Sequence, residues 1–472
     1  MAEPRVVVLG AGPAGVGAAY QLRRPARAQV TVVEQNTVVG GNAGSFEAGG
    51  QRVDFGSHRL HPACDPAILA DIRTLLGADL LDRPRHGRIH LQGKWIHFPL
   101  KPADLLLKLD KGFAAATMRD MAAKALGRRR DEGDSFASVL MANLGPTICQ
   151  EFYFPYARKI WGHEPEALSG IQARRRVSAG SFLKLIRKVA SAVPGLKPPG
   201  AGRFFYPRRG YGQISEAYAE AAQKLGAEFL LGWKMSGLEP RPGGGWVVRA
   251  ERQGAERCLA ADYVWSTIPI TILARAIGSG VPPEVTAASG QIDYRSMLLV
   301  YLELDVQQFT EYDAHYFPGG DIRITRLSEP KNYAALSEPR GRTTLCAELP
   351  CSPKDPWWQM TDEELGQVVA DDLARAGIPL ARPPVHVLTR RLRQAYPIYL
   401  KGYETPFGIL DRWVEALPSL LSYGRQGLFA HDNTHHALYM AYCAVECLEN
   451  GRWNAEKWQG FRKVFETHVV ED

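Results

Sequence analysis

The feature that most constrains this chain is a glycine-rich turn between two apolar segments near its start. Gly10, Gly12 and Gly15 follow the Val-rich run 5–9, and an Ala-rich helical pattern then leads to a second apolar run at 29–33. In such a turn the first glycine permits the bend, the second lets the backbone approach a pyrophosphate, and the third lets helix pack on strand. The helix start offers unpaired N–H groups to an anion. The pattern predicts a dinucleotide-binding βαβ unit.

The second strand of this unit ends in an acid, Glu34. A carboxylate about 20 positions after the turn can bind ribose hydroxyls, and it disfavours a 2′-phosphate at that place. We expect Ala14, inside the turn, to contact the cofactor as well. A tight turn without ligand is the alternative, but the full order of strand, turn, helix, strand and acid favours a dinucleotide site.

Length and composition limit the class of protein. A chain of 472 residues, of which 45% are hydrophobic, is expected to form two or three interleaved domains. A formal charge of +7 selects no class of partner by itself, and we predict no nucleic-acid partner. The seven cysteines are scattered without a C-x-x-C pair, which indicates reduced thiols and a cytoplasmic protein. We predict no metal site, because no third ligand accompanies His435 and His436.

The expected strands indicate a discontinuous nucleotide-binding domain. Strands are predicted at 6–9, 29–33, 263–268 and 427–431, and we expect them to form one sheet. The predicted fold class is α/β, with a discontinuous Rossmann-like domain, an inserted helical region and a mixed β-sheet substrate domain. The expected boundaries are 1–63, 203–290 and 385–472 for the nucleotide-binding domain, 64–202 for the helical region and 291–384 for the β-rich substrate domain.

Several short motifs, taken in order, resemble a known family. The chain is similar to the FAD-dependent amine-oxidase and protoporphyrinogen-oxidase-like superfamily, and within it to the UDP-galactopyranose mutases. The segments that carry the resemblance are Gly-Ala-Gly-Pro-Ala-Gly at 10–15, Val-Gly-Gly-Asn-Ala-Gly-Ser at 39–45, Asp-Phe-Gly-Ser-His at 54–58, the aromatic run 152–161, Pro-Arg-Arg-Gly-Tyr-Gly at 207–212, Thr-Ile-Pro at 267–269, Tyr-Pro at 396–397 and Gly-Arg-Gln-Gly at 424–427.

The resemblance implies both a cofactor and a reaction. The cofactor would be FAD, and the further contacts expected for it are Gly41, Asn42, His58, Pro269, Asp432 and Asn433. The reaction would be pyranose–furanose ring isomerisation of a nucleotide sugar through an adduct between reduced flavin and sugar. Such a reaction is redox-neutral but needs flavin reduced by NAD(P)H or another reductant.

Four residues are candidates for substrate binding or catalysis. The resemblance implies that Arg176 and Arg425 bind the substrate diphosphate. Planar guanidinium groups match the geometry of phosphate oxygens. We expect a strand after Arg425; Arg176 lies in an Arg-Arg-Arg run, so a solvated position is its alternative. His58 either lies against the flavin ring or bonds to its own loop. His435 is the candidate for reaching the substrate from the last helix.

The sequence departs from the family near its end. Thr434, His435 and His436 replace the usual residues of the signature before the last helix. An FAD-dependent oxidase or dehydrogenase of an amine, a polyene or a sugar-derived substrate therefore stays open, as does a non-catalytic flavoprotein. Asp432 and Asn433 either face the flavin or only cap the helix. The basic amphipathic segment 182–193 is expected to pack on the core, with membrane contact as its alternative.

Overall fold

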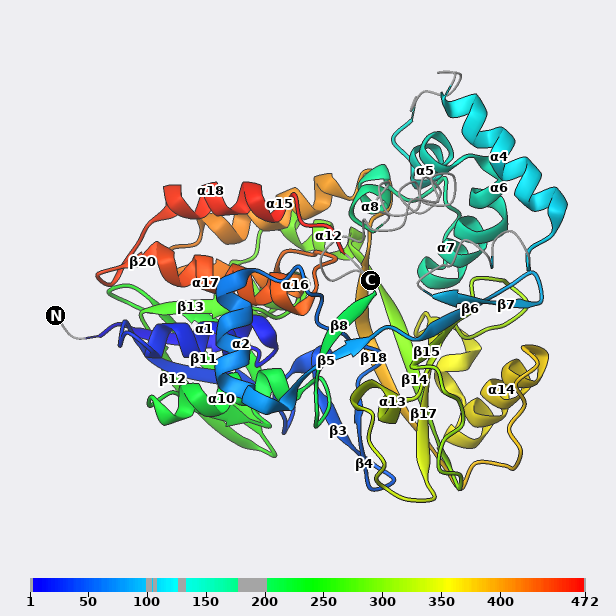
Figure 1. Ribbon diagram of the computed structural model, residues 1–472. Helices are drawn as coiled ribbons and strands as arrows, with labels where there is room; N and C mark the ends of the chain where they lie inside the picture. Colours follow the sequence, from blue (N-terminus) through cyan, green and yellow to red (C-terminus); the bar gives the residue numbers. More distant parts are fainter. Residues whose placement is uncertain (1–2, 99–103, 105–107, 126–132, 177–201, 471–472) are drawn as a thin grey trace.

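The protein is built around two β-sheets that lie side by side. The computed structural model describes residues 3–98, 104, 108–125, 133–176 and 202–470. In Figure 1 the segments from both chain ends form the left part, and a long sheet with helices above and beside it forms the right part. Among the described residues, no helix combines the length and the apolar character needed to cross a membrane.

The first sheet is five-stranded and parallel. Its order is β19-β13-β1-β2-β9. Val6 and Val8 of β1 pack into one hydrophobic cluster, whereas Val7 and Leu9 pack into another on the opposite face. Burial on both faces is why this strand is Val-rich without alternation. The strands are β1 (Arg5–Leu9), β2 (Gln29–Glu34), β9 (Glu228–Leu231), β13 (Tyr263–Ser266) and β19 (Leu420–Ser422).

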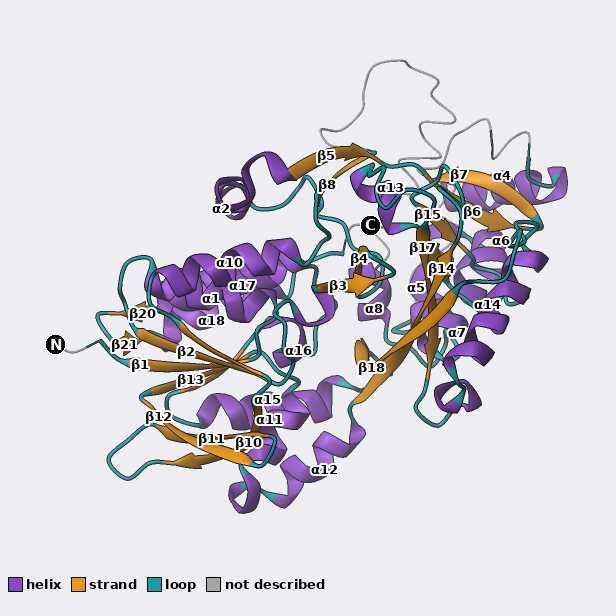
Figure 2. Cartoon of the chain, turned by 90° about the horizontal axis from the view of Figure 1, so that it is seen from below, coloured by secondary structure: helices purple, strands orange, loops and turns teal. Residues whose placement is uncertain are grey.

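Helices cover both faces of this sheet (Figure 2). One face carries α1 (Pro13–Arg23), α10 (Gln213–Lys224) and α17 (Thr434–Cys447). The other face carries α11 (Ile270–Ala276), α12 (Pro283–Gln291), α15 (Glu404–Ala416) and a three-stranded sheet of β10 (Lys234–Pro240), β11 (Trp246–Arg252) and β12 (Ala255–Ala261). The predicted Rossmann-like arrangement is confirmed, since β1, α1 and β2 follow one another as expected.

One predicted strand of this sheet is wrong. Residues 427–431 do not form a strand; the short helix α16 (Gly424–Gly427) ends there, and β19 takes the sheet edge instead. Phe429 has φ 48°, a left-handed backbone that interrupts an extended segment. Arg425 therefore lies in a helical turn, and no strand follows it. The apolar run misled the prediction because a short buried run has no period of its own.

The second sheet is seven-stranded and mixed, with the order β18-β14-β17-β16-β15-β6-β7. One side carries α14 (Asp362–Arg375), which begins with a capping box of Thr361 and Glu364. The strands are β6 (Gly87–Leu91), β7 (Lys94–Phe98), β14 (Asp293–Leu304), β15 (Ala314–Tyr316), β16 (Arg326–Ser328), β17 (Thr343–Cys351) and β18 (His386–Ile398).

Strand β18 is an edge strand of the second sheet. It pairs with β14 from His386 to Ile398, although the sequence grouped residues after 385 with the nucleotide-binding segments. The hairpin of β6 and β7 likewise joins the second sheet from within the region predicted as mainly helical. We propose that the second domain includes β6, β7 and β18, with the other boundaries as predicted.

The helical region stands next to the seven-stranded sheet (Figure 1). It contains α4 (Lys111–Ala125), α5 (Phe136–Leu144), α6 (Pro146–Ile148), the π-helical turn η3 (Cys149–Tyr153), α7 (Phe154–Trp161) and α8 (Gly170–Arg176). The predicted segment 182–193 lies outside the described residues.

The remaining elements connect these parts. They are η1 (Gly41–Ala43), β3 (Ser45–Ala48), β4 (Gln51–Asp54), α2 (Pro66–Leu76), η2 (Gly77–Asp79), β5 (Leu80–Pro84), β8 (Arg203–Pro207), η4 (Gly278–Gly280), α13 (Pro330–Ala334), η5 (Pro356–Gln359), β20 (Leu448–Glu449), β21 (Arg452–Trp453) and α18 (Ala455–Phe465).

Candidate cofactor and substrate site

A single large cavity is lined by residues from both sheets and from the helical region. Its volume is about 1610 Å³, which exceeds the ~300–1,000 Å³ usual for a site that holds one small ligand. The start of α1, the start of α17, strands β14 and β18, and helix α7 all contribute side chains or backbone to its lining. The cavity has room for a large cofactor together with a second molecule.

The glycine turn presents bare backbone to this cavity. Gly12 is the N-cap of α1 without a capping side chain, and a Cβ built on it meets no atom within 4 Å. A Cβ on Gly15 would lie 1.9 Å from the carbonyl oxygen of Gly10, so Gly15 serves the packing of helix on strand. An anion can therefore approach the N–H groups at the start of α1 across Gly12.

Glu34 is fixed beside the turn. Its Oε2 accepts a hydrogen bond of 2.8 Å from the Ala11 N–H, and its Oε1 accepts bonds of 2.8 Å from the backbone and side-chain N–H groups of Asn36. Burial raises the pKa of this carboxyl group, while these hydrogen bonds oppose the shift. Because Glu34 also lines the cavity, it is placed to accept from a hydroxyl group of a bound nucleotide.

The start of α17 forms a second backbone edge of the cavity. Asp432, Asn433 and Thr434 line it. Asn433 is the N-cap of α17, and its N–H donates 3.2 Å to Nδ1 of His436 in a capping box. Asn433 therefore both caps the helix and borders the cavity, so the two interpretations of this residue are compatible.

Two arginines flank one tyrosine in the lining of the cavity. The guanidinium carbon of Arg176 lies 5.1 Å from the ring centre of Tyr396 and 5.2 Å from that of Trp161. The guanidinium carbon of Arg425 lies 5.2 Å from the Tyr396 ring centre. Burial, together with the nearby Arg176, lowers the pKa of Arg425. Two cations held this close favour an anionic ligand between or beside them.

Arg425 carries a charge and also forms two hydrogen bonds to backbone carbonyl groups. Its Nη1 donates 2.8 Å to the carbonyl oxygen of Asp432, and its Nη2 donates 3.0 Å to that of Ala395. It thereby joins β18 to the turn before α17. The arginine that the sequence proposed for the substrate diphosphate therefore also holds the backbone at Asp432.

His58 lines the cavity on a loop that is held from several sides. Its Nε2–H donates 3.0 Å to the carbonyl oxygen of Phe55, and its ring stacks on Tyr211 with 5.3 Å between centres. Burial lowers the pKa of His58, and the carboxylate of Asp54 opposes this shift. His58 is thus a neutral ring bonded to its own loop, and it also faces the cavity.

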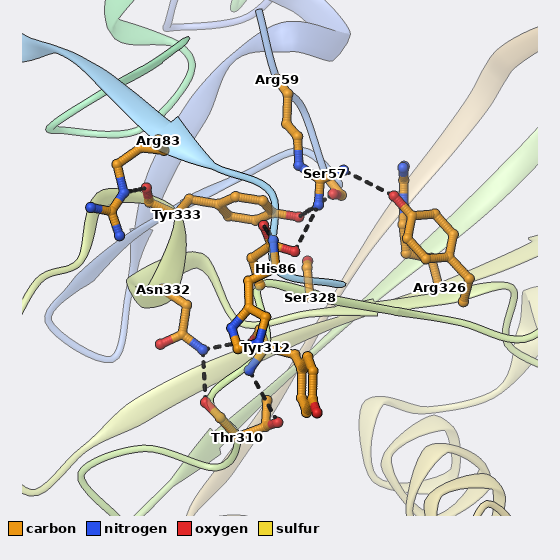
Figure 3. Close-up of polar contacts among 12 residues, drawn as sticks. Ser57, Arg59, Arg83, His86, Thr310, Tyr312, Arg326, Ser328, Asn332 and Tyr333 are labelled. Carbon is orange, nitrogen blue, oxygen red and sulfur yellow. Dashed lines mark hydrogen bonds and ion pairs between the residues drawn. The ribbon is translucent and has the colours of Figure 1, made fainter. Parts of the chain in front are cut away.

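Hydrogen bonds behind this loop fix its position (Figure 3). The Ser57 hydroxyl bonds to that of Tyr333, and Arg59 donates 3.1 Å to Asp313 and 3.3 Å to the Tyr333 hydroxyl. Burial opposes the charge on Arg59, but Tyr316, Tyr333 and Asp313 outweigh it and raise its pKa. The loop that carries His58 therefore rests on a charged, buried support.

Sequence reasoning missed a buried ion pair in the cavity wall. Arg326 donates 2.9 Å and 2.8 Å to the two carboxylate oxygens of Glu348, and Glu348 also accepts 2.8 Å from the Ser57 N–H. Both side chains line the cavity. They come from neighbouring strands, β16 and β17, with no motif around either one, so only strand pairing could have revealed them.

The structure does not bring His435 to the cavity. Its ring is buried against His436, with 4.1 Å between ring centres, and it is not among the lining residues. Burial, followed by the nearby His61, lowers the pKa of His435 to about 4. His435 is therefore a neutral residue packed against His436 in the first turn of α17.

The sequence argument against a metal site assumed that no third ligand existed. In the structure, one ligand atom each from Asp432, His436 and His468 lie within 4.8 Å of one another. However, Nδ1 of His436 already accepts from the Asn433 N–H, and the rings of His436 and His468 stack with 4.2 Å between centres. These contacts favour a packed hydrogen-bonded cluster, and the absence of a metal stays a prediction.

Most of the residues proposed from the sequence meet in this one cavity. Those that line it are Gly10, Gly12, Ala14, Glu34, Gly41, Asn42, His58, Arg176, Pro269, Arg425, Asp432 and Asn433. Arginines outnumber acids in the lining, since Arg59, Arg85, Arg203, Arg326, Arg390, Arg391 and Arg393 also take part, against Glu34, Glu348 and Asp432. The cavity suits ligands that carry phosphate groups.

Known proteins share this fold and parts of this sequence. A family model described as flavin-containing amine oxidoreductase matches residues 13–442. Chloroplastic protoporphyrinogen oxidase 1 of Arabidopsis thaliana is 25% identical over 483 residues, covering 94% of this chain and 86% of that protein. The solved structure of a reduced UDP-galactopyranose mutase superposes with a TM-score of 0.82 at 19% identity, covering 99% of this chain and 100% of the other. Cyclohexylamine oxidase from Brevibacterium oxydans gives a TM-score of 0.65 at 18% identity, covering 98% and 100%.

Proposed function

Because the chain belongs to the family of flavin-containing amine oxidoreductases, we propose that it is a flavin-dependent mutase acting on a nucleotide sugar or a related glycosyl diphosphate. The protein is an FAD-dependent enzyme. The proposal concerns the reaction: conversion between pyranose and furanose rings without net oxidation.

The residues present fit FAD. The open backbone at Gly12, the carboxylate of Glu34 and the start of α17 at Asp432 line one continuous cavity. The first would bind the diphosphate of the cofactor, the second its ribose, and the third would place helix N–H groups near the flavin. Bound FAD supplies the redox-active ring, which in its reduced state is a nucleophile.

The single observation that carries the proposal is the pair Arg176 and Arg425 around Tyr396. A glycosyl diphosphate needs a cationic site that stabilises the diphosphate as it leaves the sugar. Arg425 also bonds to the backbone of Asp432, so this site adjoins the cofactor edge. Trp161 then provides a wall against which the remainder of the substrate can pack.

An oxidase or dehydrogenase is the second candidate. It is favoured by the strongly apolar part of the cavity wall, which includes Ile89, Leu91 and Phe152, because an uncharged substrate would need such a surface. Arabidopsis protoporphyrinogen oxidase, by its name an oxidase, is a relative over most of the chain.

The mutase and the oxidase candidates predict different results for the reduced and the oxidised enzyme. We would incubate dithionite-reduced, FAD-loaded protein anaerobically with UDP-, GDP- and TDP-sugars and follow pyranose and furanose forms by chromatography. The mutase proposal predicts isomerisation by the reduced protein without stoichiometric NAD(P)H consumption. If a substrate instead bleaches the oxidised flavin and peroxide forms in air, the oxidase candidate replaces it.

The supply of electrons and the cellular location are parts of the same proposal. A mutase needs its flavin reduced, so NAD(P)H or another reductant would act on it. All seven cysteines lie within the described residues and none of them forms a disulfide, which suits the reducing cytoplasm proposed from the sequence. Fluorescence microscopy of a tagged chain in its own cell would test the location.

A further inference from the structure

The end of the cavity next to the helical region is lined by one apolar cluster. Its buried members are Ile89, Leu91, Ile96 and Leu109, and Phe98, Phe113, Phe152 and Tyr316 pack against them. All eight of these residues line the cavity. They come from β6, β7, β15, α4, η3 and the chain just before α4. We name this cluster the apolar chamber.

Polar groups are few in the apolar chamber, although the guanidinium carbons of Arg85 and Arg326 lie 5.9 Å from the ring centres of Phe98 and Tyr316. Among its eight side chains only Tyr316 carries a polar atom, and that hydroxyl accepts 2.9 Å from Nη1 of Arg59. A nucleobase has donors and acceptors along its edge, and leaving them unpaired in such a wall is unfavourable. A hydrocarbon chain has no such requirement, and each buried methylene raises its affinity about fourfold.

One helical segment connects the chamber to the two arginines. Phe152, Tyr156, Ile160 and Trp161 line the cavity at helical spacing along η3 and α7. With a rise of 1.5 Å per residue, Phe152 and Trp161 lie about 14 Å apart along this axis. Trp161 contacts Arg176, so the anionic site and the chamber are neighbouring compartments along one wall.

We propose that the substrate is a glycosyl diphosphate whose diphosphate is esterified to a long apolar alcohol, such as a polyprenol, in place of a nucleoside. The sugar faces the cofactor edge, the diphosphate binds Arg176 and Arg425, and the apolar chain fills the chamber. This inference rests on the proposed function for its sugar and diphosphate. Its own evidence is the chamber and its continuity with the arginine pair.

A series of synthetic esters tests the chain directly. Reduced, FAD-loaded protein is titrated with galactosyl diphosphate esters of methanol, geraniol and farnesol, and with UDP-galactose, while tryptophan fluorescence reports the dissociation constant. Affinity is expected to rise at least ~10-fold from the methyl to the farnesyl ester and to exceed that for UDP-galactose. Equal affinity for all esters, or tightest binding of UDP-galactose, overturns the inference.

Product analysis of the same samples separates this inference from the proposed function. Chain-length-dependent binding with ring isomerisation supports both. Chain-length-dependent binding without isomerisation supports the apolar chamber as a chain site and overturns the mutase. Isomerisation of UDP-galactose with no effect of chain length supports the mutase proposal and overturns the proposal that the apolar chamber binds a hydrocarbon chain.

A pair of variants on one helix locates the chain. Phe113 of α4 faces the chamber and is half-buried, whereas Met118 on the same helix is 58% exposed. Phe113→Ser should weaken binding of the farnesyl ester about 10-fold and leave the methyl ester unaffected; Met118→Ser should change neither. Flavin content and methyl-ester binding report whether the variants are folded, and equal farnesyl affinity in both variants contradicts the assignment.

Discussion

The two ends of the cavity are lined differently, one mainly by backbone and the other mainly by long side chains. The cofactor end consists of backbone at two helix starts, with Gly12 bare and Asn433 capping its helix. The substrate end consists of long side chains, Arg176, Arg425 and Tyr396, from three separate elements. Backbone geometry serves one cofactor in many proteins, whereas side chains can be exchanged without altering the fold. We therefore propose that side chains, those of the second end together with those of the apolar chamber, determine which substrate binds.

The largest expected effect comes from filling the bare backbone of the cofactor end. Gly12→Val places a side chain in space that the protein leaves open, so the chain should fold but purify without FAD. The visible absorption spectrum measures this. Gly290→Val is the control, since a Cβ there also meets no atom within 4 Å but lies in α12, away from the cavity. Full flavin content in Gly12→Val would refute the assignment of the cofactor end.

The buried pair of Arg326 and Glu348 in the cavity wall should matter most for stability. Glu348→Gln leaves Arg326 without its counter-charge in a buried wall, which should lower the free energy of unfolding by about 3–5 kcal/mol. Glu338→Gln breaks the exposed pair with Arg340 and should cost about 0–1 kcal/mol. Chemical denaturation followed by circular dichroism compares them, and similar losses in both variants would mean that the cavity pair is not structurally important.

Arg425 should affect both ends, unlike Arg176. Arg425→Leu removes two hydrogen bonds from a charged group to backbone carbonyls, those of Asp432 and Ala395. Since such bonds contribute about 1.5–3 kcal/mol, we expect FAD affinity to fall roughly 10- to 100-fold. Arg412→Leu, an exposed position on α15, is the control. Unchanged FAD affinity, measured by ultrafiltration, would confine Arg425 to the substrate end.

The smallest effect concerns the support of α7. Lys159 donates 3.2 Å to the carbonyl oxygen of Ile324, and burial lowers its pKa to about 8. The unfolded chain, with an ordinary lysine pKa near 10.4, holds more protons between these values. Stability should therefore rise with pH between about 8 and 10 by up to about 1.4 kcal/mol per unit from this group.

The control for this pH dependence is Lys159→Met, which has no titrating ammonium. Denaturation midpoints of the two proteins are compared at pH 7.5, below the window given by the lowered pKa, and at pH 8.5 and 9.5, within it. The difference in slope between wild type and variant belongs to Lys159. Parallel pH profiles would show that the ammonium is not destabilised by burial.

The contrast between the two ends also explains what the sequence could predict. Gly10 to Glu34 is a local pattern, and each glycine has a backbone reason that can be read from its neighbours. Arg326 and Glu348 are in contact only because β16 pairs with β17. No local sequence pattern around either residue predicts such a contact. Arg176 and Arg425 were identified through resemblance, and Tyr396 belongs to one of the motifs that carry it, but only the structure places this tyrosine against both arginines.

Two predictions were wrong because the local sequence does not show the contacts that decide the conformation. The run 427–431 is apolar like a strand, but the left-handed Phe429 breaks it, and a short buried run does not reveal its conformation. His435 was expected to reach the substrate from the start of the helix that the structure shows as α17. Its side chain instead packs against His436, and the direction of a helical side chain depends on packing partners that are far away in the sequence.

The most direct test of a separate anion site at the substrate end is the affinity of FAD-loaded protein for inorganic diphosphate, measured by isothermal titration calorimetry in wild type, Arg176→Ala and Arg174→Ala. Arg174 is an exposed neighbour on α8, so its variant is the matched control. We predict about 10- to 100-fold weaker binding for Arg176→Ala, unchanged binding for Arg174→Ala and equal flavin content in all three. Equal diphosphate affinity in the three proteins would contradict the account.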